Sequence, residues 1–176
     1  AAAIDYNAGI YVSEKGSAVA SDFVLDNIGP YNLNWIFIYG WLAIVALMIC
    51  YPIIAQVNMV HRVLAQFSFL IIVRSFFMTL THLKTPLTAM SQDFPGALSF
   101  FQFQNDLFFS GHTAVPFFGF LIYKGHSIRC LFLAGSIVMA ATVLLMHEHY
   151  TIDVLSAYFI TFGCYKLAQF FSPFKK

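Results

Sequence analysis

Long apolar stretches separated by short polar segments dominate this chain. They cover residues 34–57, 63–82, 107–123, 128–147 and 152–171. A helix that crosses the hydrocarbon core of a bilayer needs about 20 mostly apolar residues, and the five stretches come close to that length. The pattern therefore predicts an all-α fold, a multi-pass transmembrane bundle with five spans.

The first 33 residues are too polar to cross a membrane, since Asp5, Glu14, Asp22 and Asp26 fall among them. We expect a polar N-terminal segment over residues 1–33, part of it as a helix at the membrane interface. Residues 34–176 then form the transmembrane domain.

The composition supports a membrane protein. The chain of 176 residues is 60% hydrophobic and only 10% charged, whereas soluble domains carry roughly 25% charged residues. A net charge of +1 argues against a nucleic-acid partner. Cys50, Cys130 and Cys164 show no paired spacing, which favours packing over a disulfide or metal role.

Charge predicts the orientation of the bundle. Five crossings place one group of cations on the same face: Arg62, Lys124, Arg129, Lys175 and Lys176. All eight acidic residues fall on the opposite face, which the positive-inside rule makes exoplasmic. The N-terminus would then be exoplasmic as well, so we expect an earlier span or a cleaved signal upstream of Ala1.

Chemistry-bearing residues gather on this exoplasmic side. His149 and Asp153 are four residues apart, so they share one helix face and the carboxylate can fix the imidazole tautomer. Ser110, Gly111 and His112 begin another apolar segment, where free N–H groups suit an anion. Together these residues offer a nucleophile, an acid that orients it, a proton donor and a set of backbone N–H groups at residues 110–112 that could bind an anion, which we name the anion cradle. The alternative is an interfacial histidine–acid pair with a structural role only.

Arg74 lies about 12 Å inside the second stretch at 1.5 Å per residue, where an arginine costs on the order of 3 kcal/mol. It should therefore face the bundle interior, either as a clamp for a lipid phosphate or in a structural pair with Asp106 or Asp22. Asp22 and Asp26 could line a headgroup entrance, although simple solvation is favoured.

A metal site is the weaker interpretation of the histidines. His147 and Glu148 suggest a zinc-protease motif, but H-E-x-x-H needs a second histidine where this chain has Thr151. We therefore expect no metal and no cofactor. His61, His82 and His126 stand at span ends and are expected to be interfacial.

The motifs SGHT (110–113) and HYTIDV (149–154) resemble the second and third motifs of the type 2 phosphatidic acid phosphatase superfamily. HEHYTID followed by AYFIT (157–161) is closer to its sphingomyelin synthase branch, and weaker similarity extends upstream to Asp22. The phosphatase pattern K-x6-R-P is not present, and Thr142-Val143 replace a Ser-Arg pair. These departures favour transfer of a headgroup over removal of a phosphate. The branch normally has six spans.

The resemblance implies an enzyme in which His149 attacks phosphorus, Asp153 orients it and His112 moves the proton. It also implies substrate binding by a second set of residues: Arg74, Ser110, Gly111, Thr113 and Tyr150.

We expect a metal-independent lipid phosphotransferase that moves a phospho-headgroup from a glycerophospholipid to a lipid alcohol such as ceramide or diacylglycerol. A phosphatase or phospholipase C-like hydrolase on the same residues is the alternative, and a non-catalytic lipid-binding protein is the third. Headgroup, acceptor and oligomeric state stay open.

Overall fold

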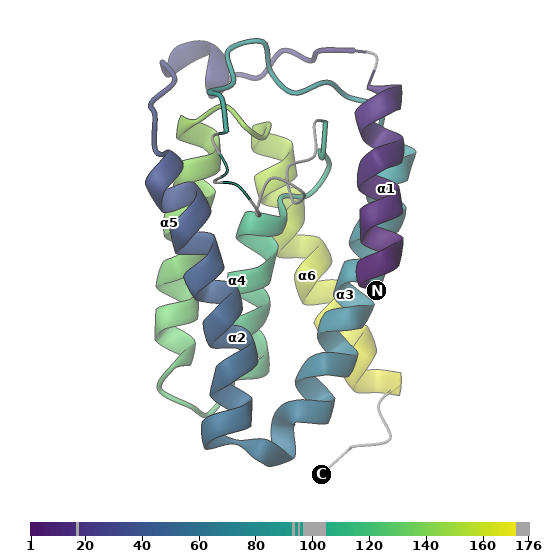
Figure 1. The fold of residues 1–176 in the computed structure, drawn as a ribbon, viewed down its shortest axis with the longest axis vertical. Coiled ribbons are helices and arrows are strands. Elements are labelled where there is room, and N and C mark those ends of the chain that lie inside the picture. The colour runs from purple at the N-terminus through teal and green to yellow at the C-terminus, as the bar shows by residue number, and fades with distance from the viewer. Residues whose placement is uncertain (17, 93, 95, 97–104, 172–176) are drawn as a thin grey trace.

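The computed structural model describes residues 1–16, 18–92, 94, 96 and 105–171, and these form helices with no β-strand among them. The α-helices stand side by side as a multi-pass bundle, as predicted (Figure 1). They are α1 (Ala2–Lys15), α2 (Trp41–Ala55), α3 (Val60–Leu80), α4 (Gly111–Ile122), α5 (Arg129–Leu145) and α6 (Thr151–Phe171). Short 3-10 or π turns flank them at η1 (Leu25–Asn27), η2 (Ile36–Gly40) and η3 (Val57–Met59).

All five apolar stretches contain a helix. Three helical segments in the described part are long and apolar enough to cross a membrane: Ile36–Ala55, Val57–Leu80 and Thr151–Phe171. The helices α4 and α5 are apolar but shorter, with 12 and 17 residues.

The start of α4 differs from the expected start of its span at residue 107. Asn105, Phe108 and Phe109 adopt positive φ angles of 59°, 66° and 69°, a left-handed conformation that interrupts a helix and is uncommon for residues other than glycine. The helix therefore begins only at Gly111, below the upper ends of α5 and α6 (Figure 1). This recess lies at the SGHT motif.

The core is centred on α4, which packs against α2, α3, α5 and α6. The contact with α5 is close, because a Cβ on Gly119 would lie 2.5 Å from the Phe132 ring. Large apolar side chains such as Ile54 and Phe159 are exposed on the outside of the bundle. This is the distribution that a lipid-facing surface requires.

The N-terminal segment contains the helix α1; its place at the membrane interface stays a prediction. Ala8 and Val12 of α1 pack against Met78 of α3, and Figure 1 shows α1 beside the upper part of α3. The contact brings Asp5 of α1 within hydrogen-bond distance of Arg74 and Ser75 of α3.

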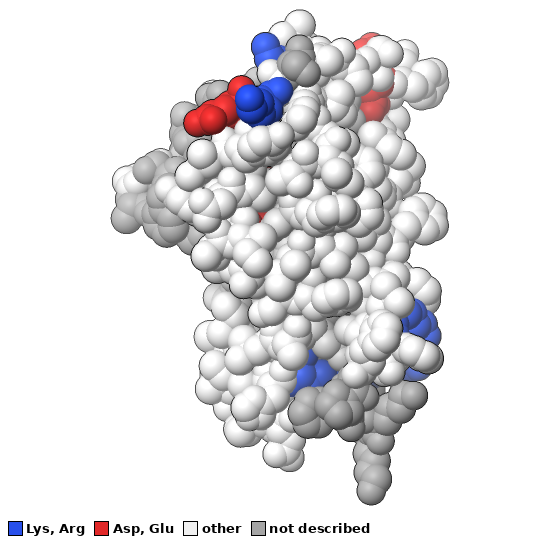
Figure 2. Space-filling model, turned by 90° about the vertical axis from the view of Figure 1, so that its right-hand side faces the viewer, with Lys and Arg blue, Asp and Glu red and all other residues white. Residues whose placement is uncertain are grey.

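On the face shown in Figure 2, exposed charged side chains lie at the two ends of the bundle. Figure 2 shows Lys, Arg, Asp and Glu at the upper end of one face, only Lys and Arg at the lower end, and a nearly uncharged surface between them. The helix order places Arg62, Lys124 and Arg129 at the same end of the bundle, since α3 and α5 begin there and α4 ends there. The uncharged band matches a membrane-embedded region.

Candidate active site

The turn between α5 and α6 positions His149 and Asp153. His147 has a φ of 57°, which ends α5 and turns the chain toward α6. Asp153 is the third residue of α6 and is fully buried. Its Oδ2 lies 3.3 Å from Nδ1 of His149 and accepts a hydrogen bond of 3.0 Å from the N–H of Tyr150. His149 and Asp153 are paired, as the spacing predicts, but His149 lies two residues before the start of α6, so the two residues do not share a helix face as expected. The pairing leaves Nε2 of the ring for chemistry.

His112 lies across a small pocket from this pair. It is the second residue of α4, and its ring stacks on Phe37 with 4.1 Å between centroids and lies 5.3 Å from Trp41. The pocket of about 50 Å³ is lined by Phe37, Thr85, Gln92, Phe94, Asp106, His112, Glu148 and His149. This volume is of the order of one or two water molecules, so a lipid headgroup requires the pocket to widen. The structure thus brings the two motif histidines to one place.

The first turn of α4 supplies unused backbone donors. The first hydrogen bond within the helix runs from the N–H of Ala114 to the carbonyl of Ser110, at 2.9 Å. The N–H groups of Gly111, His112 and Thr113 precede it and have no acceptor within the helix. The N–H of Ser110 donates to the carbonyl of Asp153 at 3.1 Å, which joins the start of α4 to the start of α6.

Ser110 does not cap α4 through its side chain. Its Oγ is one of several buried polar atoms around these two helix starts with no hydrogen-bond partner among the described residues: Arg74 Nε, Ser110 Oγ, Thr113 Oγ1 and Asp153 Oδ1. An unsatisfied buried polar group costs about 1–3 kcal/mol. Their concentration here marks the place where a polar ligand or water would complete the bonding.

Arg74 is buried and paired with two carboxylates. Its Nη2 donates to Asp106 at 2.5 Å and its Nη1 donates to Asp5 at 3.2 Å. Of the two structural partners predicted from the sequence, Asp106 is confirmed and Asp22 lies elsewhere. The guanidinium also lies against the SGHT turn, since a Cβ on Gly111 would be 3.1 Å from Nε and 3.4 Å from Cζ. Arg74 therefore adjoins the anion cradle as well as being ion-paired.

The contact with Arg74 predicts the result of Gly111→Ala. The added methyl group should displace the guanidinium by a few tenths of an ångström and lower kcat/KM by roughly tenfold, because catalysis is sensitive to small misplacements. The free energy of unfolding should not fall, since alanine favours a helix by up to about 1 kcal/mol over glycine. Gly163→Ala in α6 is the matched control, because nothing lies within 4 Å of its Cβ position. Unchanged kinetics in Gly111→Ala would show that the close approach has no role in turnover.

Glu148 is a pocket residue to which the sequence assigned no role beyond the disfavoured metal site. Its side chain is 7% exposed, and Nε2 of Gln92 donates a hydrogen bond to its Oε2. Burial raises the pKa of Glu148, although the Gln92 hydrogen bond and the nearby His149 oppose the shift. No group of three or more potential ligands in the described part of the chain could hold a metal.

Glu148→Gln should reveal this raised pKa in the stability of the protein. The folded state of the wild type retains the proton above the ordinary value of 4.5, so its stability falls as pH rises from there toward the folded pKa, by about 1.4 kcal/mol per pH unit. The glutamine variant lacks this loss. We expect equal free energies of unfolding below pH 4.5 and a growing advantage for the variant above it, measured by denaturation in detergent micelles. Parallel pH curves for the two proteins would contradict this.

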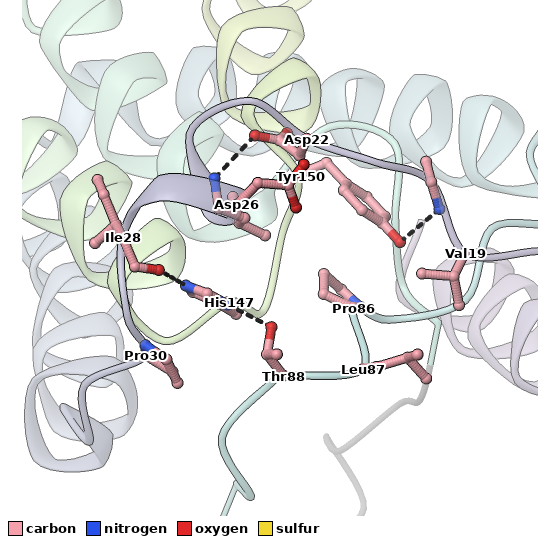
Figure 3. Close-up of a pocket in the computed structure, with 12 residues that line it drawn as sticks. Val19, Asp22, Asp26, Ile28, Pro30, Pro86, Leu87, Thr88, His147 and Tyr150 are labelled. Atoms are coloured by element: carbon pink, nitrogen blue, oxygen red, sulfur yellow. Dashed lines mark hydrogen bonds between the residues drawn. The ribbon is translucent and has the colours of Figure 1, made fainter.

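His147 and Tyr150 point away from the histidine pocket. The ring of His147 bonds to Thr88 Oγ1 at 2.5 Å and to the carbonyl of Ile28 at 2.9 Å. The hydroxyl of Tyr150 donates to the carbonyl of Lys84 and accepts from the N–H of Ala20. Both line a second pocket of about 410 Å³ (Figure 3). Substrate binding by Tyr150 stays a prediction. The role of His147 is structural, because its ring joins the segment of Thr88 to the segment of Ile28.

Comparison with known proteins identifies the C-terminal part of the chain. Residues 105–170 match the family described as PAP2 superfamily C-terminal. Phosphatidylcholine:ceramide cholinephosphotransferase 2 from Rattus norvegicus and that from Mus musculus are each 39% identical over 64 residues. No solved structure matches the chain.

The family match covers the motif region. Each alignment includes 32% of this chain and 17% of the relative's length, so the chain spans less than a fifth of the curated relatives it matches. His112, His149 and Asp153 all lie within the matched residues 105–170. Residues 105–170 are thus similar to the C-terminal family of the PAP2 superfamily, and the two relatives support the resemblance to the sphingomyelin synthase-like branch of that superfamily.

Proposed function

We propose that this protein is an integral-membrane lipid phosphotransferase that moves a phospho-headgroup from a glycerophospholipid to a lipid alcohol, of the ceramide or diacylglycerol type. One observation carries the proposal: His149, which is paired with Asp153, and His112 line the same pocket at the start of α4. The matched relatives bear the name of a phosphatidylcholine:ceramide cholinephosphotransferase, which agrees with this substrate class.

In the first step, Nε2 of His149 attacks the donor phosphorus. The bond from phosphorus to the diacylglycerol oxygen breaks as the bond to nitrogen forms, and protonated His112 gives its proton to the departing oxygen. Asp153 holds Nδ1–H and stabilises the positive charge that develops on the ring, as carboxylates do in other histidine-dependent sites.

In the second step, the hydroxyl of the lipid alcohol attacks the phosphohistidine. His112, now neutral, accepts the hydroxyl proton, and His149 leaves as a neutral imidazole. Both residues return to their starting states, and the reaction needs no metal.

The phosphate would bind at the start of α4. The free N–H groups of Gly111, His112 and Thr113, the hydroxyl of Ser110 and the guanidinium of Arg74 surround this position. Donors held in place before the reaction stabilise the charge of the transition state without reorganisation. The buried donors without a partner among the described residues, Arg74 Nε, Ser110 Oγ and Thr113 Oγ1, support this assignment.

Hydrolysis on the same residues is the second candidate function. A pocket of about 50 Å³ admits a water molecule, which could attack the phosphohistidine in place of a lipid alcohol. Transfer is favoured because closed, dry sites suppress hydrolysis of reactive intermediates and the cations of the phosphatase pattern are missing.

The distribution of charge supports an exoplasmic site, with Lys and Arg alone at the opposite end of the bundle.

The test uses the purified chain with phosphatidylcholine labelled in its headgroup, with and without diacylglycerol or ceramide, and with EDTA. Label that moves to the lipid alcohol and is unaffected by EDTA supports the transferase. Free phosphocholine formed at the same rate without acceptor indicates the hydrolase. Bound phosphatidylcholine without turnover indicates a lipid-binding protein, and loss of activity in EDTA contradicts metal independence.

A further inference from the structure

Asp22 connects the N-terminal part of the chain to the helix that carries Asp153. It belongs to residues 18–31, which we name the N-terminal strap. Its Oδ2 accepts a hydrogen bond from the N–H of Thr151 at 2.6 Å, and its Oδ1 accepts one from the Thr151 hydroxyl at 2.7 Å. Thr151 is the first residue of α6, so a side chain 129 positions away caps this helix.

The carboxylate of Asp22 is itself held rigidly. Its Oδ1 accepts from the N–H groups of Val24 and Leu25, and its carbonyl accepts from the N–H of Asp26. Figure 3 shows Asp22 on the strap, close to Tyr150 at the edge of the pocket. Burial would raise the pKa of Asp22, but the hydrogen bonds from Thr151 and two further N–H groups outweigh it and lower the pKa. The side chain is therefore ionised at neutral pH, which suits the positive end of a helix.

Thr151 lies midway between the two groups that must meet. His149 is two residues before it and Asp153 two residues after it. Without an acceptor for its first N–H groups, a helix frays in its first turn. Fraying at Thr151 would change the separation of 3.3 Å between His149 Nδ1 and Asp153 Oδ2.

We propose that Asp22 is a positioning residue for the reaction, which acts by capping α6 and so fixing His149 against Asp153. It lines the pocket of about 410 Å³ beside Tyr150 and not the pocket that contains both motif histidines. The inference rests on the proposed function and adds the N-terminal strap to the catalytic apparatus. The sequence favoured a solvated Asp22, and these contacts correct that interpretation.

Asp26 supplies a matched control. It has the same charge, lies four residues along the strap and lines the same pocket, but its side chain is exposed and makes no hydrogen bond or ion pair with the described residues of α6. Asp26→Asn therefore changes the charge of the pocket without changing the cap.

The experiment compares Asp22→Ala, Asp22→Asn, Thr151→Val and Asp26→Asn in the headgroup-transfer assay. We expect Asp22→Ala to lower kcat about 100-fold with KM changed less than about threefold, since misplacement of roughly 1 Å has an effect of this size. Asp22→Asn retains one acceptor oxygen and Thr151→Val retains the backbone N–H, so each should lose roughly tenfold in kcat. Asp26→Asn should match the wild type.

A second readout does not depend on turnover. The rate at which diethyl pyrocarbonate modifies His149, followed by mass spectrometry, should rise in Asp22→Ala because a frayed α6 exposes the ring, which is 6% exposed in the intact protein. Modification and kcat equal to those of Asp26→Asn would overturn the positioning role while leaving the proposed function intact. A wild type without turnover would overturn the proposed function, and unchanged modification in Asp22→Ala would then overturn the cap separately.

Discussion

Replacing His149 by alanine should lower headgroup transfer by at least about 10⁴-fold, since loss of a nucleophile has an effect of this size or more in other enzymes. The ring is the only group in the proposed mechanism that bonds to phosphorus. Alanine also removes the partner of a fully buried carboxylate. His149→Gln should therefore be tested beside it, because its amide can still donate toward Asp153.

A donor with a good leaving group separates the two histidines. A p-nitrophenyl ester of phosphocholine needs no proton on its leaving oxygen, so His112→Ala should still form the phosphoenzyme and release nitrophenolate. His149→Ala should not. His147→Ala is the matched control, since His147 contacts Thr88 and Ile28 outside the pocket. Nitrophenolate release at the wild-type rate in His149→Ala would contradict the covalent mechanism.

The apolar pattern predicted the helices well because lipid imposes a simple rule, in which long apolar runs must form helices that satisfy their own backbone. The recessed start of α4 could not be predicted in this way. It depends on positive φ angles at Asn105, Phe108 and Phe109, which are held by tertiary contacts such as the pair of hydrogen bonds between Asn105 and Thr85. Asparagine is enriched at positive φ, but phenylalanine is not, so no local preference indicates the conformation of Phe108 and Phe109.

The same distinction applies to the site. His149 and Asp153 could be paired from their spacing, and the number of spans placed His112 beside them. Asp22 and Asp5 could not be assigned, because their partners Thr151 and Arg74 are 129 and 69 residues away in sequence. The spacing of residues along the sequence predicts contacts between near neighbours in the chain. The contacts of Asp22 and Asp5 depend instead on how the N-terminal segment packs on the bundle.

Arg74→Lys should lower kcat/KM by about 100-fold, because an ammonium group cannot reproduce the planar fork of donors that fits carboxylates and phosphates. Arg74 is 8% exposed, while Asp5 and Asp106 are 30% and 27% exposed. Lysine keeps the charge between these carboxylates but loses the Nε that faces Gly111. Transfer kinetics and thermal unfolding of the same preparation measure both effects. Wild-type kinetics in Arg74→Lys would exclude a role for the fork.

A second set of variants separates the phosphate clamp from the structural ion pairs. Asp5→Asn/Asp106→Asn leaves a buried guanidinium without either carboxylate, and breaking a buried pair in this way costs about 3–5 kcal/mol. Arg74→Met should be less destabilising, since the two acids that remain are in partial contact with water. If Arg74 binds the substrate phosphate, phosphocholine can replace the lost carboxylates. It should then raise the Tm of the Asp5→Asn/Asp106→Asn protein more than that of the wild type and leave Arg74→Met unchanged. Equal shifts in all three proteins would mean that Arg74 serves only to hold α1 and the segment before α4 against α3.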